Sequence, residues 1–112
     1  VGGQYNPATA AFFGPETIDA FRSIPITKAF LCCSGLSLYG GLSNETYYDP
    51  IIKRIVIDRS LVKILVTDTS KFNVNATRIV CPLGDMDVLV TNDKPSQDYI
   101  DYCQENDVQL LY

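Results

Sequence analysis

The residues of this sequence that could bind a small anion are polar groups directly after two apolar segments. The segments are residues 28–33 and 62–67, and the polar groups that follow them are Ser34, Gly35, Asp68, Ser70 and Lys71. An ammonium group, hydroxyl groups and a glycine backbone N–H are donors that hold a phosphate or a carboxylate in proteins. If the segments are neighbouring strands of one sheet, we expect these groups to converge on one anionic small molecule.

Lys71 and Asp49 also have ordinary structural interpretations. Asp68 can hydrogen-bond the backbone of its own turn, and Lys71 would then be a solvated turn residue. Asp49 precedes Pro50 and the apolar face of residues 51–56, so it is either the N-cap of a helix or a ligand of the site. The residue pattern leaves both choices open.

The composition excludes several classes of chemistry. Histidine is absent from the 112 residues, which excludes Ser-His or Cys-His catalysis and His-ligated metals within this chain. The net charge is −4 and Lys and Arg form no cluster, so we expect no nucleic-acid-binding surface in this chain. No apolar run approaches the roughly 20 residues that span a bilayer, and we expect no membrane contact.

The cysteines do not form a metal or redox motif. Cys32 and Cys33 are adjacent within an apolar run, and no Cys-x-x-Cys pair occurs. A chain with this much apolar sequence does not need a disulfide scaffold. We therefore expect reduced, packed thiols, no bound metal and no cofactor.

Helices and short apolar strands alternate along the chain. Pro15 and Pro50 stand at first helical positions and Ser96 at a capping position, which predicts three helices. A Gly- and Ser-rich loop is expected after residue 34. The expected strands are the apolar runs at residues 28–33, 62–67, 78–81, 88–91 and 108–111. Continuous apolar runs are typical of strands buried on both faces of a sheet. The sequence thus predicts an α/β fold with a mostly parallel sheet flanked by helices, whose ligands bind beyond the carboxyl ends of the strands.

Several segments, in order, match a known pattern. They are residues 1–3 (Val-Gly-Gly), 13–15 (Phe-Gly-Pro), 28–31 (Lys-Ala-Phe-Leu), 34–35 (Ser-Gly), 41–43 (Gly-Leu-Ser), 53–54 (Lys-Arg), 66–72 (Val-Thr-Asp-Thr-Ser-Lys-Phe) and 82–87 (Pro-Leu-Gly-Asp-Met-Asp). Over nearly the whole chain the sequence resembles the effector-sensing domain of DeoR-type bacterial transcriptional regulators. The Asp-x-Ser-Lys-Phe segment followed by the Pro-Leu-x-Asp-x-Asp segment is the specific part of the resemblance.

The resemblance implies a fold, a function and a domain organisation. The fold is the one shared by ribose-5-phosphate isomerase, sugar-phosphate deaminases and CoA transferases. The function is sensing of a phosphorylated sugar in a cytoplasmic, homo-oligomeric regulator, a repressor of sugar-metabolism genes. Residues 1–112 would be the later part of the sensor domain. The DNA-binding winged helix-turn-helix and the first strands of the sensor would lie upstream, so DNA would be bound only through the absent domain.

The resemblance also implies roles for individual residues. Lys71 matches the family's lysine that contacts the sugar phosphate, and Asp68 and Ser70 surround it. Ser34 and Gly35 match a loop that borders the effector pocket. The resemblance therefore implies the same effector-binding residues that the strand ends indicate.

The sequence departs from the family pattern at two places near the expected pocket. Residues 49–50 are Asp-Pro where the family usually has Glu-Ala, and the proline is expected to shift the Asp49 side chain away from the pocket. Residues 32–33 are Cys-Cys where the family has small Gly or Ala residues, which narrows the pocket floor. Both departures leave the identity of the effector open.

Two other functions are alternatives to sensing. A sugar-phosphate isomerase or deaminase of the same fold needs a positioned acid and base, for which Asp68, Asp85 and Asp87 are available but no His or strand-end Glu. A ligand-free oligomerisation domain would use exposed tyrosines for subunit contacts, and the candidates are Tyr47, Tyr48, Tyr99, Tyr102 and Tyr112. Turnover of a sugar phosphate, or binding of a metabolite without turnover, discriminates between these functions.

Overall fold

The computed structural model describes residues 1–112 as an alternation of strands and helices. In chain order the elements are β1 (Gln4–Asn6), β2 (Ala11–Phe13), α1 (Pro15–Arg22), β3 (Ile26–Leu31), β4 (Gly35–Ser37), β5 (Gly41–Asn44), α2 (Tyr48–Arg59), β6 (Ser60–Val66), η1 (Thr69–Lys71), β7 (Arg78–Cys81), η2 (Leu83–Asp85), β8 (Val88–Val90), α3 (Gln97–Glu105) and β9 (Gln109–Leu111), where η is a 3-10 helix. Every helix and strand expected from the sequence is present. The short strands β1, β2, β4 and β5 are additional.

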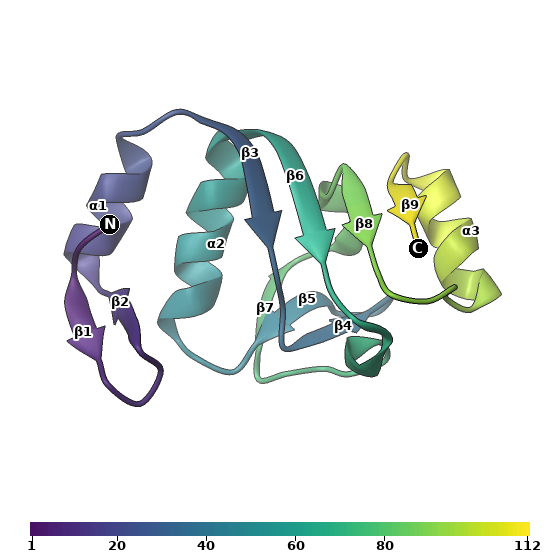
Figure 1. The fold of residues 1–112 in the computed structure, drawn as a ribbon, viewed down its shortest axis with the longest axis horizontal. Coiled ribbons are helices and arrows are strands. Elements are labelled where there is room, and N and C mark those ends of the chain that lie inside the picture. The colour runs from purple at the N-terminus through teal and green to yellow at the C-terminus, as the bar shows by residue number, and fades with distance from the viewer.

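The central sheet is parallel and has the strand order β3-β6-β8-β9 (Figure 1). Helix α2 connects β3 to β6 by way of the intervening hairpin, and α3 connects β8 to β9. Parallel neighbours need such crossover connections because the chain must return to the same end of the sheet. The prediction of an α/β fold with a mostly parallel sheet flanked by helices is confirmed.

A second sheet, antiparallel and three-stranded, replaces the loop expected after residue 34. Its strand order is β4-β5-β7, with Leu36 paired to Leu42. Both leucines are fully buried, so the segment is anchored in the core despite its many small residues. The glycine at position 35 is needed because a Cβ there would lie 2.4 Å from the carbonyl oxygen of Val74. Close approach of neighbouring backbone explains why Gly and Ser dominate here.

Helix α2 begins earlier than the sequence suggests. Its first residue is Tyr48, and Tyr47 at the N-cap makes no side-chain capping bond. Asp49 therefore lies inside the first turn, and the interpretation of Asp49 as the N-cap is wrong. Helix α1 begins at Pro15 as expected, and Ser96 occupies the N-cap of α3 without a side-chain capping bond. None of the helices has the length and the apolar sequence that a membrane crossing requires.

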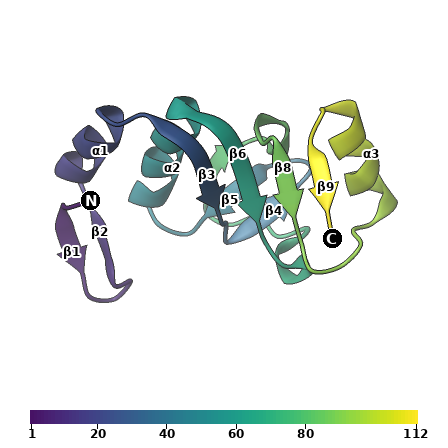
Figure 2. The ribbon, with the colours of Figure 1, turned by 45° about the horizontal axis from the view of Figure 1, so that its top comes forward.

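One face of the parallel sheet forms the core of the molecule. Leu31, Leu65 and Leu89 on this face are buried, and they lie in one cluster with Tyr99 and Cys103 of α3. Figures 1 and 2 show α2 and the antiparallel sheet on this side. Burial of these side chains removes apolar surface from water and is the main source of stability of the fold.

The opposite face of the parallel sheet is apolar and has no covering element. Phe30 is 71% exposed, and Val66 and Leu111 are each 45% exposed. In the register of the sheet, Phe30 of β3 is the neighbour of Ile64 of β6, and Val66 of β6 is the neighbour of Val90 of β8. No helix lies over this face in either view (Figures 1 and 2). The expectation that these strands are buried on both faces is therefore wrong for the chain described here.

The four cysteines are free, and three of them are buried. Burial raises the pKa of the Cys33 and Cys103 thiols and raises that of Cys81 to about 11. Cys32 is exposed, so the expectation of packed thiols holds for three positions and fails for this one.

Thiol labelling at pH 8 is expected to separate Cys32 from the other cysteines. The thiolate is the reactive form, and a buried thiol with a raised pKa is both inaccessible and protonated. One thiol per chain should react rapidly with Ellman's reagent in the native protein, and the remaining thiols only after denaturant is added. The Cys32→Ser variant should lose the rapid phase, whereas rapid reaction of a second thiol would contradict the packing described here.

Candidate functional site

A hollow of about 530 Å³ lies at the carboxyl ends of β3, β6 and β8. Its walls come from the residues that follow each strand: Cys32, Cys33, Val66, Thr67, Asp68, Lys71, Val90, Thr91 and Asn92. These three strands are neighbours in the sheet, as the anion-site hypothesis required. The hollow is therefore at the edge of the sheet where ligands of α/β folds bind.

Lys71 is held in this hollow by the rest of its motif. The Asp68 carboxylate accepts a hydrogen bond from the Ser70 backbone N–H (2.9 Å) and one from the Ser70 hydroxyl, and together these hold the pKa of Asp68 below its usual range. The Phe72 ring packs on Tyr99, with the ring centroids 4.7 Å apart. Both ends of the turn are thus fixed, while the Lys71 ammonium takes part in none of the salt bridges of the chain.

The floor and the far wall of the hollow are tied together by hydrogen bonds. The Cys33 thiol lies 3.9 Å from the Thr67 hydroxyl, and both side chains are buried. The Asn92 side-chain oxygen accepts a hydrogen bond of 2.9 Å from the Thr69 backbone N–H. This bond joins the loop after β8 to the loop after β6, two of the segments that line the hollow.

The structure does not bring all the expected residues into this hollow. Ser34, Gly35 and Ser70 are absent from its lining. The Ser34 hydroxyl oxygen lies 3.4 Å from the Asn44 amide nitrogen, which donates to it. Gly35 packs against a neighbouring backbone in β4, and the Ser70 hydroxyl is used by Asp68. These three residues therefore do not contribute to the lining of the hollow.

Lys53 is a residue that the sequence did not single out for the site. Its ammonium donates hydrogen bonds to the Cys32 backbone carbonyl (2.5 Å) and to the Asn44 side-chain oxygen (2.9 Å). Lys53 therefore connects α2 to the end of β3, where Cys32 lines the hollow. The sequence shows a lysine on the polar side of a helix, within the Lys-Arg pair of the family pattern, and nothing in it indicates a contact with Cys32, 21 residues away.

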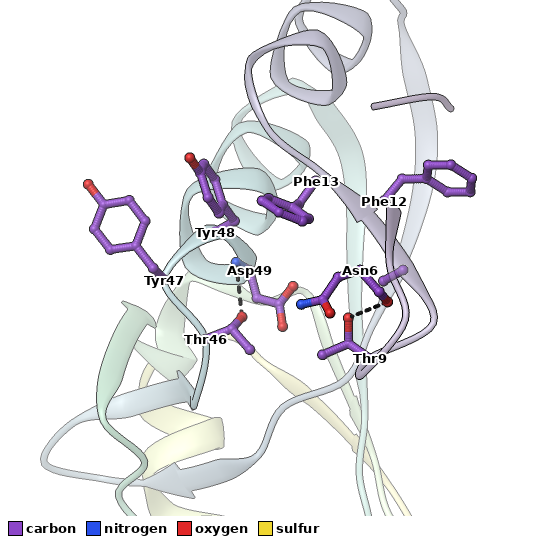
Figure 3. Close-up of a pocket in the computed structure, with 9 residues that line it drawn as sticks. Asn6, Thr9, Phe12, Phe13, Thr46, Tyr47, Tyr48 and Asp49 are labelled. Carbon is purple, nitrogen blue, oxygen red and sulfur yellow. Dashed lines mark hydrogen bonds between the residues drawn. The ribbon is translucent and has the colours of Figure 1, made fainter. Parts of the chain in front are cut away.

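Asp49 lies in a different hollow. This second hollow, of about 330 Å³, is bounded by the β1–β2 hairpin and the beginning of α2 (Figure 3). Its lining residues are Asn6, Thr9, Ala11, Phe12, Phe13, Thr46, Tyr47, Tyr48 and Asp49. Asp49 therefore does not line the same cavity as Lys71. No pattern in the sequence indicated this hollow, because the hairpin that forms it was not expected.

The Pro-Leu-x-Asp-x-Asp segment has a structural role. Asp85 forms a salt bridge of 3.1 Å with Arg54 of α2, and the Asp87 carboxylate accepts a 2.8 Å hydrogen bond from the Lys63 backbone N–H. Met86 between them is buried. The segment thus connects the start of β8 to β6 and to α2. Strand β8 in turn leads to Thr91 and Asn92, which line the hollow together with Lys71.

The comparison with protein families identifies the class of this chain. Residues 1–93 match the family described as the DeoR C terminal sensor domain. Because the match covers most of the chain, the chain belongs to this family. The parallel sheet flanked by helices is the fold expected of it.

The similar proteins of known name are transcriptional regulators. The chain is 26% identical over 110 residues to the HTH-type transcriptional regulator IolR of Bacillus subtilis, with 98% of this chain and 44% of that protein covered. It is 26% identical to the glycerol-3-phosphate regulon repressor of Escherichia coli, with 97% and 43% covered. It is 22% identical to the L-fucose operon activator of Haemophilus influenzae, with 98% and 44% covered. The chain spans less than half the length of these relatives.

Proposed function

We propose that this chain senses a phosphorylated sugar for a DNA-binding transcriptional regulator, and that Lys71 binds the phosphate. The observation that carries the proposal is that Lys71 is the residue of its motif whose side chain has no partner within the protein. Asp68, Ser70 and Phe72 each have a partner within the protein, and the Lys71 ammonium has none. An unpaired ammonium in a hollow at the ends of parallel strands fits a small anion.

The relatives support a phosphorylated metabolite as the anion. One relative is named for the glycerol-3-phosphate regulon and another for the L-fucose operon. Phosphate binds lysine as a point charge and accepts hydrogen bonds from nearby hydroxyls. Thr67 and Thr91 carry hydroxyls in the lining, and these now donate only long hydrogen bonds, of 3.4 Å to the Asp68 carbonyl and 3.5 Å to the Asn92 side chain. The regulator is expected to act in the cytoplasm as a homo-oligomer, because helix-turn-helix regulators usually bind paired half-sites.

We further propose that the chain is the later part of the sensor domain. The bare face of the parallel sheet supports this proposal, because parallel sheets are otherwise covered on both faces. Strand β3 is at the edge of the sheet, so one row of its backbone groups is also unpaired. Upstream strands and helices of a longer protein would pair with this edge and cover this face, and a winged helix-turn-helix before them would bind DNA.

The Phe30→Ala variant of the full-length protein tests this domain organisation. If upstream elements cover the sheet face, Phe30 is buried in the longer protein and its loss costs about 3 kcal/mol of unfolding free energy. Tyr39, which is 97% exposed, provides the matched control, and Tyr39→Ala should cost less than about 0.5 kcal/mol. Urea unfolding measures both values. An equally small effect at Phe30 would mean that the face stays bare.

The proposal does not include catalysis. Of the three carboxylates considered for an enzyme, Asp85 is paired with Arg54 and Asp87 with the Lys63 backbone, and neither lines the hollow. Asp68 does line it, but its hydrogen bonds from Ser70 hold the pKa of this carboxyl below its usual range, which makes it a weak base. General acid–base chemistry needs a group that is free to exchange a proton with the substrate. A bound effector that is not converted is therefore expected.

Two of the five tyrosines that the oligomerisation hypothesis assigned to subunit contacts have partners within the chain. Tyr99 is fully buried in the core, and the Tyr102 hydroxyl lies 3.1 Å from the Gly84 backbone nitrogen, which donates to it. These tyrosines hold the fold together and are not free for subunit contacts. Tyr47 and Tyr112 are exposed as that hypothesis expected.

A thermal-shift screen of the full-length protein tests the proposed function. Pentose and hexose phosphates, glycerol 3-phosphate and inorganic phosphate form the panel, because a ligand of the native state raises Tm by mass action. At least one phosphorylated sugar should raise Tm without being turned over. No shift with any phosphate in a folded protein would favour the ligand-free oligomerisation domain.

A further inference from the structure

Lys53 of α2 holds the segment that leaves the carboxyl end of β3. Helix α2 packs against β3 (Figure 1), and the Lys53 ammonium donates hydrogen bonds to the Cys32 carbonyl and to the Asn44 side-chain oxygen. Asn44 in turn donates to the Ser34 hydroxyl, with 3.4 Å between the amide nitrogen and the oxygen. Lys53 thus holds, directly and through Asn44, the residues on both sides of Cys33.

Cys33 carries a backbone donor that the protein does not use. The residue is 8% exposed, its thiol contacts the Thr67 hydroxyl, and its N–H donates no hydrogen bond within the chain. Nearly all buried N–H groups in proteins have a partner, which is a protein group, water or a ligand. Cys32 and Cys33 both line the hollow at the carboxyl ends of β3, β6 and β8. A free N–H at this place is a donor available to a bound anion.

The bond from Lys53 sets the direction of this N–H. The chain has no cis peptide bonds, and in a planar trans peptide the N–H points opposite to the C=O. Because the ammonium holds the Cys32 carbonyl toward α2, the Cys33 N–H points away from α2. On the other side of Cys33, the Ser34 N–H donates to the Ser43 carbonyl (2.9 Å). Both neighbouring peptides are therefore held in place.

The charge of Lys53 also reaches this part of the hollow. Burial raises the pKa of the Cys33 thiol, and the charges of Lys53 and Lys71 both oppose this rise. The interaction between charges falls off with distance, so both ammonium groups lie near Cys33. Lys53 is absent from the lining, because its ammonium is bonded to the Cys32 carbonyl and to Asn44. An anion at Cys33 is therefore in the field of both charges without contacting Lys53.

We propose that Lys53 is a positioning residue of the effector site, which aims the Cys33 N–H at the phosphate that Lys71 binds. The inference rests on the proposed function, since it adds a second phosphate-binding group to the hollow of Lys71. Lysine binds phosphate as a point charge, whereas a hydrogen bond from a fixed N–H to a charged oxygen is both strong and directional. Lys71 thus supplies the charge, and the Cys33 N–H determines where the phosphate lies.

Isothermal titration of the full-length protein tests the role of Lys53. The probes are inorganic phosphate and the phosphorylated sugar with the largest Tm shift in the screen. Lys53→Met keeps most of the side-chain length and removes the ammonium, and it should raise the Kd of both probes roughly 10-fold, as expected for the loss of one hydrogen bond to a charged group. Lys53→Arg should restore most of the affinity, because a guanidinium can donate to the same carbonyl.

Arg59→Met is the matched control. Arg59 also lies on α2, and its side chain donates a 3.0 Å hydrogen bond to the Ile24 carbonyl, before the start of β3 and therefore at the opposite end of the strand from the hollow. The variant removes a similar connection between α2 and the β3 segment and should leave both Kd values unchanged. A comparable loss of affinity in Arg59→Met and Lys53→Met would show that Lys53 acts only on the stability of the fold.

The NMR amide signal of Cys33 tests the donor directly. The full-length protein is labelled only at cysteine nitrogen, and the Cys33→Ser variant assigns the signal. Donation to phosphate moves an amide proton downfield, so saturating inorganic phosphate should shift the Cys33 signal in the parent protein and in Arg59→Met, but not in Lys53→Met. An unshifted Cys33 signal in the phosphate-saturated parent overturns the proposal, whether or not Lys53→Met folds. Weaker binding by Lys53→Met with the same shift as the parent would mean that Lys53 contributes only its charge.

The outcomes separate this inference from the proposed function. If Lys71→Ala weakens the binding of both probes while Lys53→Met binds them as the parent protein does, the sensor function stands and Lys53 has no positioning role. If neither probe binds the folded parent protein, both proposals fail.

Discussion

Replacing Lys71 by alanine in the full-length protein is expected to raise the Kd for the phosphorylated sugar roughly 100-fold, about 3 kcal/mol. The ammonium is the only positive charge in the lining of the hollow. Removing it leaves the phosphate, a desolvated anion, without an opposite charge, which is more costly than losing one neutral hydrogen bond. Thermal shift and isothermal titration with the same ligand should give the same ranking of variants.

The stability of the unliganded protein is expected to be unchanged by this substitution, because the Lys71 ammonium has no partner to lose. Lys94→Ala is the matched control, since Lys94 is also a strand-end lysine but does not line the hollow. It should bind the sugar phosphate as the parent protein does. Equal binding by the Lys71 and Lys94 variants would make Lys71 an ordinary surface lysine.

Binding alone does not make a regulator, so the same variants should also be compared on DNA. A ligand shifts operator affinity only by as much as its affinity differs between the DNA-binding and the non-binding states. If Lys71 holds the effector, operator binding by Lys71→Ala should be insensitive to ligand concentrations that alter the parent protein. Its operator binding without ligand should be unchanged.

The main sheet could be predicted from the sequence because its strands are short segments in which apolar residues predominate. Residues 62–67 and 88–91 correspond to β6 and β8 within one residue or two, and prolines 15 and 50 correctly indicated helices. The strands of the antiparallel sheet were missed because they are short and rich in Gly and Ser. Leu36 and Leu42 pair with each other and are both buried in a core cluster whose other members, such as Leu89 and Tyr99, are distant in sequence.

The candidate site was only partly predictable, for a related reason. Strand-end position correctly placed Asp68 and Lys71 in one hollow. It did not distinguish a side chain that faces the hollow from one that bonds its own turn, as Ser70 does. It also gave no information on Lys53 or on the hairpin, because both reach the region through tertiary contacts that have no local sequence pattern.

The bare face of the parallel sheet shows a further limit of sequence reasoning. The pattern of residues 28–33 favours a strand buried on both sides, whereas Phe30 is 71% exposed. If upstream elements cover this face, as proposed above, the pattern correctly describes the longer protein. An apolar pattern reports the environment in which the strand folds, and that environment can include residues outside the chain in hand.

The largest effect on stability is expected from Gly41→Ala. Gly41 has a φ of +70°, in the left-handed region, and a Cβ there would lie 2.1 Å from the Cys81 carbonyl oxygen and 2.7 Å from the Pro82 Cα. Both obstacles are backbone atoms, so the antiparallel sheet must separate where Leu42 pairs with Cys81. The left-handed conformation costs a residue with a Cβ about 1–2 kcal/mol, and the clash adds about 1–3 kcal/mol.

The neighbouring glycine provides the control for Gly41→Ala. A Cβ on Gly40 would meet only side-chain atoms of Asn75 and Ser37, which can move, so Gly40→Ala should cost about 1 kcal/mol or less. Gly41→Ala should lower the free energy of unfolding by about 4 kcal/mol in urea titrations. Because β5 is continuous with the segment that leads into α2, the Gly41 variant should also disturb both hollows. Similar stabilities of the two variants would mean that β5 and β7 do not pair in the register described here.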